Sequence, residues 1–185
     1  HTLYLSSAAS DVYKRQGVLR PRQPNRLDED ERRLVEELYP SLRRFASAVR
    51  PPGEDGNDLV QEALLRVIRG RGSLTGLDHP AAYLRKTILH LAQDLQRSER
   101  RRRRAWVRLG AERADVPAYS WELEELRLVS PKSRAVLYLR IIEGRPYEDI
   151  ARMLGCTQTS ARVAATRGKQ QLKSALSKEV SDATA

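Results

Sequence analysis

Cysteine, aromatic residues and long apolar runs are all scarce in this chain of 185 residues. The one cysteine, Cys156, excludes an intramolecular disulfide and any zinc site made only of cysteines, and it fits a reducing cytoplasm. Aromatic residues make up 5% of the chain, so any core must be built from Leu, Val, Ile and Ala. No apolar run approaches the roughly 20 residues of a membrane span. The sequence therefore predicts a cytoplasmic chain with an aliphatic core.

The residue groupings on which most enzymes depend are missing as well. The chain shows no paired-carboxylate site, no cluster of Cys and His ligands and no glycine-rich phosphate loop. Nothing in the sequence argues for catalysis, and we expect neither a cofactor nor a metal ion.

Positive charge is in excess. The net charge of +10 indicates a polyanionic partner, which would be either nucleic acid or an anionic membrane surface. The charge is unevenly spread, because residues 28–104 carry a net +3, residues 105–125 a net −3 and residues 126–185 a net +6. An acidic break between two basic blocks predicts two domains and a linker.

The abundance of Leu, Ala, Arg and Glu favours an all-α fold. We expect two small helical domains, at 28–104 and 122–178, joined by a flexible linker at 105–121 and followed by a tail at 179–185. Residues 1–27 show no helical or strand period and no starting Met. They resemble a vector or read-assembly remnant more than a domain, and we expect a disordered tail whose origin the sequence leaves open.

Apolar residues spaced by three and four predict helices in the first block. One helix is expected at 29–49, with acidic residues at its start, where the helix dipole favours them. A second is expected at 57–69, with Asn57 or Asp58 as its N-cap. A third begins near Pro80 and continues into the arginine-rich stretch.

The segment 146–173 has the layout of a helix-turn-helix, whose second helix enters a DNA major groove. Small Ala151 lets two helices approach closely, and Gly155 permits a left-handed turn. The second helix starts near Gln158 and contains no acidic residue until Glu179. Helical hairpins with a glycine turn also occur in bundles that bind no DNA, but the basic second helix favours DNA binding.

Two further stretches have a marked charge. Residues 97–104 hold six arginines in eight positions, which indicates either a solvated helix end or a surface that contacts phosphates. The helix at 57–69 has an acidic edge formed by Asp58, Gln61 and Glu62 beside its apolar stripe. That edge is either an exposed face over a core or a docking site, and because acids repel DNA, a protein is the better candidate partner.

The order of these parts resembles the sigma-70 family of RNA polymerase sigma factors. The likeness is to the compact extracytoplasmic-function group, and it covers about residues 29–178. It rests on the helix DLVQEALLRVIR, the stretch HPAAYLRKTILHLAQDLQRSERRRRR and, after a linker, SPKSRAVLYLRIIEGRPYEDIARMLGCTQTSARVAATRGKQQLK. The resemblance implies a factor that binds core RNA polymerase, directs it to promoter DNA and assists melting of the −10 region. Partners would be the polymerase β′ and β subunits, promoter DNA and, as is common in this group, an anti-sigma factor.

The resemblance also implies residue roles. Docking on the clamp-helix coiled coil of the β′ subunit falls to Asp58, Leu59, Gln61 and Glu62. The loop at 71–79 would capture a flipped base of the −10 element. At the −10 element, Tyr83 would stack on unpaired bases. Contacts to nearby phosphates would be made by Arg85, Lys86, Arg97, Arg100 and Arg101. Contacts to the −35 element would be made by Thr159, Ser160, Arg162, Arg167 and Lys169. Among them, Arg162 would read a base edge, and Arg167 and Lys169 would contact the DNA backbone.

The chain departs from the family pattern in the second helix of the helix-turn-helix. Ala161 stands where Val is usual, and residues 163–165 replace a more polar and basic stretch. These changes predict an unusual or weak −35 contact. Two rival functions remain open from the sequence. One is a helix-turn-helix regulator that never touches core polymerase, and the other is an arginine-rich RNA-binding or scaffold protein that is indifferent to sequence.

Overall fold

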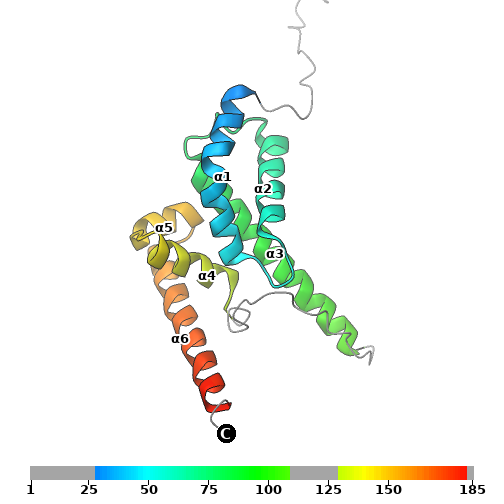
Figure 1. The fold of residues 1–185 in the computed structure, drawn as a ribbon, viewed down its shortest axis with the longest axis vertical. Helices are drawn as coiled ribbons and strands as arrows, with labels where there is room; N and C mark the ends of the chain where they lie inside the picture. The colour runs from blue at the N-terminus through cyan, green and yellow to red at the C-terminus, as the bar shows by residue number, and fades with distance from the viewer. Residues whose placement is uncertain (1–27, 109–128, 183–185) are drawn as a thin grey trace, which may run out of the picture.

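The computed structural model describes residues 28–108 and 129–182, and within them every regular element is helical. The prediction of an all-α fold with a C-terminal helix-turn-helix is confirmed. In Figure 1 the first three helices form one bundle, and the remaining helices lie against its lower part. The described elements are α1 (Glu29–Val49), α2 (Gly56–Arg71), α3 (Pro80–Arg108), α4 (Pro131–Leu137), the π-helical turn η2 (Tyr138–Ile142), α5 (Tyr147–Leu154) and α6 (Gln158–Asp182).

Helix α1 begins at a capping box. The side chain of Asp28 accepts a hydrogen bond from the Glu31 amide, and Glu31 accepts one in return from the Asp28 amide. The second carboxylate oxygen of Glu31 accepts from the buried amide of Leu74, at 3.0 Å. The acidic start predicted for this helix therefore also anchors the loop between α2 and α3.

Helix α2 begins earlier than expected. Its N-cap is Asp55, whose carboxylate accepts a hydrogen bond from the Asn57 amide, so the expected cap at Asn57 or Asp58 is wrong. The pattern of apolar residues did not predict that the helix includes Gly56, since glycine has no apolar side chain to contribute to that pattern. Its lack of a side chain lets the first turn of α2 lie directly against Ser47 of α1.

This close approach predicts a pair of opposite stability effects. A Cβ on Gly56 would lie 2.8 Å from Oγ and 3.0 Å from the backbone nitrogen of Ser47, so Gly56→Ala should lower the free energy of unfolding by about 1–3 kcal/mol. A Cβ added to Gly70, in the last turns of the same helix, would have nothing within 4 Å, and Gly70→Ala should raise stability by about 0.5–1 kcal/mol. Urea denaturation of both variants, followed by circular dichroism, measures the contrast. Equal effects of the two changes would contradict the close packing.

The C-terminal unit, α4 to α6, is built from short helices with well-defined ends. Ser130 caps α4 by accepting from the Ser133 amide, and Gly155 ends α5 in the left-handed conformation with φ +63°. Gly168 of α6 is buried against α4, where an added Cβ would lie 3.1 Å from Cβ of Ser133. Ala151 of α5 is buried, with 7% of its surface exposed.

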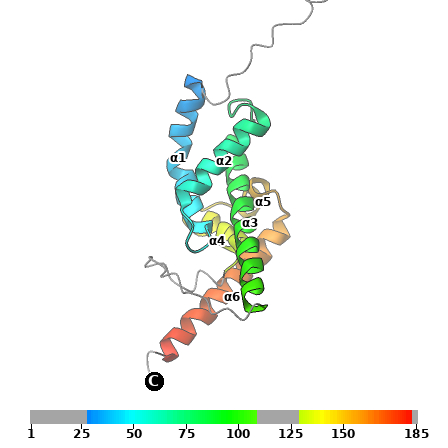
Figure 2. The ribbon, with the colours of Figure 1, turned by 90° about the vertical axis from the view of Figure 1, so that its right-hand side faces the viewer.

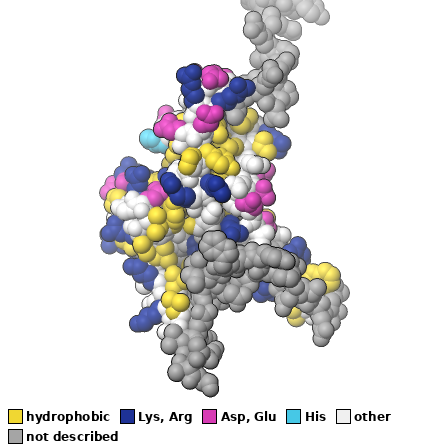
Figure 3. Space-filling view, viewed as in Figure 1, with side chains coloured by type: hydrophobic (Ala, Val, Ile, Leu, Met, Phe, Trp, Pro, Cys, Tyr) yellow, Lys and Arg dark blue, Asp and Glu magenta, His cyan; other side chains and the backbone are white. Residues whose placement is uncertain are grey.

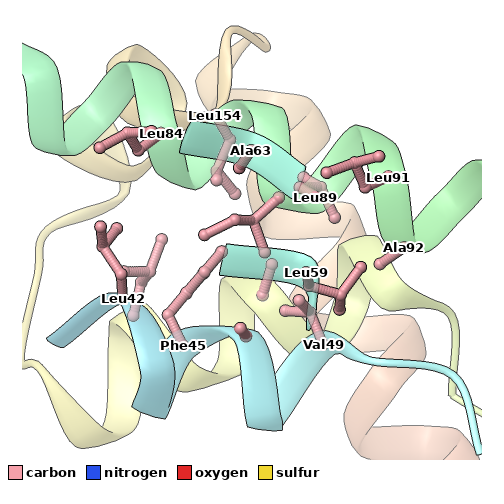
Figure 4. Packing of buried hydrophobic residues seen from close by; sticks show 14 of the residues in the cluster. Leu42, Phe45, Val49, Leu59, Ala63, Leu84, Leu89, Leu91, Ala92 and Leu154 are labelled. Atoms are coloured by element: carbon pink, nitrogen blue, oxygen red, sulfur yellow. The ribbon is translucent and has the colours of Figure 1, made fainter. Parts of the chain in front are cut away.

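The two units share one hydrophobic core. Apolar residues of α1, α2 and α3 form a continuous buried cluster with residues of α4, η2, α5 and α6. Figure 4 shows Leu154 of α5 above Leu42 and Phe45 of α1 in this cluster. The ring of Phe45 meets that of Tyr138 edge-on, with centroids 5.9 Å apart. The N-terminal unit (α1–α3) and the C-terminal unit are therefore packed against each other.

The boundaries of the elements extend beyond the predicted domains. Helix α3 runs to Arg108, four residues past the expected end of the first domain at 104, and α6 runs to Asp182, past the expected end at 178. The ends of both helices project below the body of the molecule in two perpendicular views (Figures 1 and 2). The expected tail at 1–27 and the rest of the expected linker, from 109 onward, lie outside the described residues.

Candidate nucleic-acid interface

The helix-turn-helix consists of α5, the turn at 155–157 and α6. Thr157 caps α6, its hydroxyl accepting from the Ser160 amide at 3.1 Å, and the Cys156 amide donates to the carbonyl of Ala151. Cys156 is half-buried in this turn. Lys and Arg side chains gather along the left side of the molecule, where α5 and α6 lie (Figure 3). A basic helix is thus presented on the surface at the position that recognition helices occupy.

Four of the five residues predicted to contact the −35 element are exposed on α6, namely Thr159, Arg162, Arg167 and Lys169. The fifth, Ser160, is half-buried, and its hydroxyl accepts a hydrogen bond from Nζ of Lys132 on α4, at 2.7 Å. The guanidinium of Arg162 lies over the ring of Tyr147, with 5.2 Å between its central carbon and the ring centroid. The exposed side chain of Arg162 therefore makes a cation–π contact with the first residue of the preceding helix.

Three alanines in the first half of α6 are packing residues. Ala161, Ala164 and Ala165 are 0%, 7% and 2% exposed, so these positions face the core and could not read bases with any side chain. Of residues 163–165, only Val163 is exposed. Three of the residues that weakened the expected −35 contact thus lie on the wrong face of the helix to affect it.

Helix α3 carries the six residues predicted to contact the −10 element. Arg97, Arg100 and Arg101 are exposed along its second half, where Arg97 forms an ion pair with Asp94 at 3.5 Å. Tyr83 is half-buried, and the guanidinium of Arg71 lies 5.4 Å from its ring centroid. The second half of α3 is therefore an open basic surface, and the covered tyrosine lies at the opposite, N-terminal end of the same helix.

Arg85 and Lys86 are placed differently. Arg85 is buried, and its guanidinium forms an ion pair of 2.9 Å with Glu143, which follows η2 in the C-terminal unit. Burial lowers the pKa of Arg85 from its ordinary value, and the carboxylate of Glu143 opposes that effect. Lys86 lies against the turn of the helix-turn-helix, because a Cβ on Gly155 would be 2.7 Å from its Nζ. In this arrangement Arg85 is not accessible to phosphates, contrary to the surface position expected for it.

The acidic edge of α2 is present on the surface. Asp58 and Gln61 are exposed, and Glu62 is half-exposed and paired with Arg66 at 2.9 Å. Leu59 is only 3% exposed and belongs to the core, so it cannot contact a partner in this arrangement. The edge thus consists of three polar side chains over a buried leucine.

Several residues that shape these surfaces were not predicted from the sequence. They are Arg71, Lys132, Arg134, Glu143 and Tyr147. Arg134 of α4 is 8% exposed and donates from Nη1 to the carbonyl of Arg50, which ends α1, at 2.7 Å. Burial lowers the pKa of Arg134 to about 10. The one feature of the sequence that could have indicated this buried arginine is its position directly before the apolar stretch AVLYL, because a charge beside core residues needs a specific partner.

Within the ranges that the structure describes, no group of three or more His, Cys, Asp or Glu side chains is arranged to hold a metal ion. Of the helices in those same ranges, none combines the length and apolar character needed to cross a membrane.

Comparison with known proteins agrees with this arrangement. Residues 34–102 match the family described as Sigma-70 region 2, and residues 123–172 match Sigma-70, region 4. The chain is 30% identical over 152 residues to the ECF RNA polymerase sigma factor EcfG of Rhodopseudomonas palustris (strain TIE-1), covering 74% of this chain and 80% of that protein. The fold resembles that of the sigma factor RpoE from Bartonella quintana, solved with the anti-sigma factor NepR, with a TM-score of 0.55 and 22% identity over 80% of this chain and 97% of that one.

An all-helical pair of units, one with an acidic edge on α2 and one with a basic helix-turn-helix, fits the class of transcription initiation factors. The chain belongs to the sigma-70 family of RNA polymerase sigma factors, in its extracytoplasmic-function group. It acts as a sigma factor, and a regulator that never engages core polymerase is not favoured.

Proposed function

We propose that this sigma factor docks on the clamp helices of the polymerase β′ subunit through the edge formed by Asp58, Gln61 and Glu62. The exposure of these three polar side chains over a buried Leu59 supports a rigid surface for a partner. The C-terminal unit would reach the β subunit and read the −35 element with α6. Helix α3 and the loop at 71–79 would hold the −10 element and assist its melting.

The observation that carries this proposal is the presence of both sigma-70 regions, in order, on one chain. In this proposal the polymerase, and not this chain, carries out catalysis. The sigma factor would act in the cytoplasm, where promoter DNA is found. An anti-sigma partner is also proposed. The fold likeness to a sigma factor solved with an anti-sigma factor supports it.

Run-off transcription with purified core polymerase tests the proposal. Adding this chain should produce transcripts from a subset of promoter fragments, whereas core polymerase alone should not select among them. A chain that binds promoter duplexes but yields no selective transcript with core polymerase would be a regulator of a different kind.

Two α6 variants should separate base reading from phosphate binding. Arg162→Ala should lower affinity for the preferred duplex by about 1–3 kcal/mol and relax preference at one base pair, because a guanidinium reads guanine with two hydrogen bonds. Lys169→Ala should weaken all duplexes equally and reduce the log–log salt slope by about 0.9. Fluorescence anisotropy across a salt series measures both. If Arg162→Ala weakens every sequence equally, Arg162 is a phosphate contact.

A further inference from the structure

Two guanidinium groups lie over one tyrosine ring at the base of the helix-turn-helix. Tyr147 is the first residue of α5, and it is half-buried against the core. The central guanidinium carbon of Arg162, from α6, lies 5.2 Å from its ring centroid, and that of Arg140, from η2, lies 5.3 Å away. One ring therefore brings together side chains from three consecutive elements.

The ring has a physical effect on both arginines. An aromatic face is electronegative, so it attracts each cation and offsets the repulsion between the two. An arginine that is free in solvent must be ordered when it binds a base, and ordering it beforehand removes that cost from binding. Arg140 is also fixed through Nη1, which donates to the carbonyl of Arg145 at 3.1 Å.

We propose that Tyr147 is a positioning residue that holds Arg162 ready to read a base edge and keeps Arg140 beside it for a neighbouring phosphate. The first helix of a helix-turn-helix crosses the DNA backbone while the second reads bases. Arg140 comes from η2, directly before the first helix, and Arg162 comes from the second helix. This inference rests on the proposed −35 role of α6.

Selection from a randomised duplex library, with the full chain as bait, tests the proposal. Wild type should show one position at which guanine dominates, and Arg162→Ala should abolish that preference. Tyr147→Leu should reduce the preference at the same position, whereas Tyr147→Phe should retain it because the ring remains. Arg140→Ala should leave the preference unchanged and reduce the log–log salt slope by about 0.9.

The outcomes are separable. If Arg162→Ala changes no position, the proposed reading role of Arg162 fails. If Arg162→Ala relaxes one position and Tyr147→Leu leaves that position intact, the role proposed for Tyr147 is wrong. A purely structural effect of Tyr147→Leu would lower affinity for all sequences together, and it too would overturn the positioning role.

Discussion

The double variant Asp58→Ala/Glu62→Arg is expected to bind core polymerase more than about 100-fold more weakly than wild type and to support no selective transcription. The acidic edge of α2 is exposed, and a partner that recognises it must present basic groups. Placing an arginine there sets like charges against each other, which costs several kcal/mol at an interface. Surface plasmon resonance with immobilised core polymerase measures the loss.

The fold should survive this change. The ion pair between Glu62 and Arg66 is half-exposed, and such pairs contribute little to stability. A matched control is Glu36→Ala/Glu37→Arg, which makes the same change in net charge at exposed positions of α1. The control should bind polymerase like wild type. Equal loss in both variants would mean that net charge, and not the docking edge, determines the interaction.

The second large effect is expected for Phe45→Ala, which should lower the free energy of unfolding by about 3–5 kcal/mol. Phe45 is fully buried and contacts Tyr138 across the interface between the units. Its loss leaves a cavity in a core with few other aromatic residues, and total stability is only about 5–15 kcal/mol. Urea denaturation followed by circular dichroism measures the change.

Hydrogen exchange should show that Phe45→Ala reduces protection in α4 as well as in α1, because the cavity opens into both units. Val107→Ala is the matched control, since Val107 is 75% exposed near the end of α3 and should change stability by less than about 0.5 kcal/mol. Loss of protection confined to α1–α3 would contradict a shared core.

Local features were predictable because they depend on neighbouring residues. The helix at 29–49 agrees with α1 to the residue, and the third helix begins at Pro80 as expected. The left-handed turn at Gly155 follows from the lack of a Cβ. The N-cap of α2 was misplaced, because Asp55 lies beyond the apolar pattern and Gly56 is helical through its contact with α1.

The predicted site residues also divide into those whose exposure depends on neighbouring residues and those whose burial depends on tertiary contacts. The exposed positions of Arg97, Arg162 and Lys169 followed from charge on a helix face. The burial of Leu59 and Arg85 did not, because both depend on elements distant in sequence. Arg85 finds its carboxylate 58 positions away, at Glu143, and no local pattern pairs these two residues.

The sequence by itself determined the helical class and the order of an acidic-edged and a basic unit, because composition and charge patterning act over a few residues. Its resemblance to known sigma factors indicated the family. Only the tertiary structure decided that the two units share a core, that Arg85 and Arg134 are buried between them, and that Arg162 lies over the ring of Tyr147. These contacts join residues that are far apart in the chain. Their existence depends on how apolar faces and buried charges are satisfied when the helices pack together.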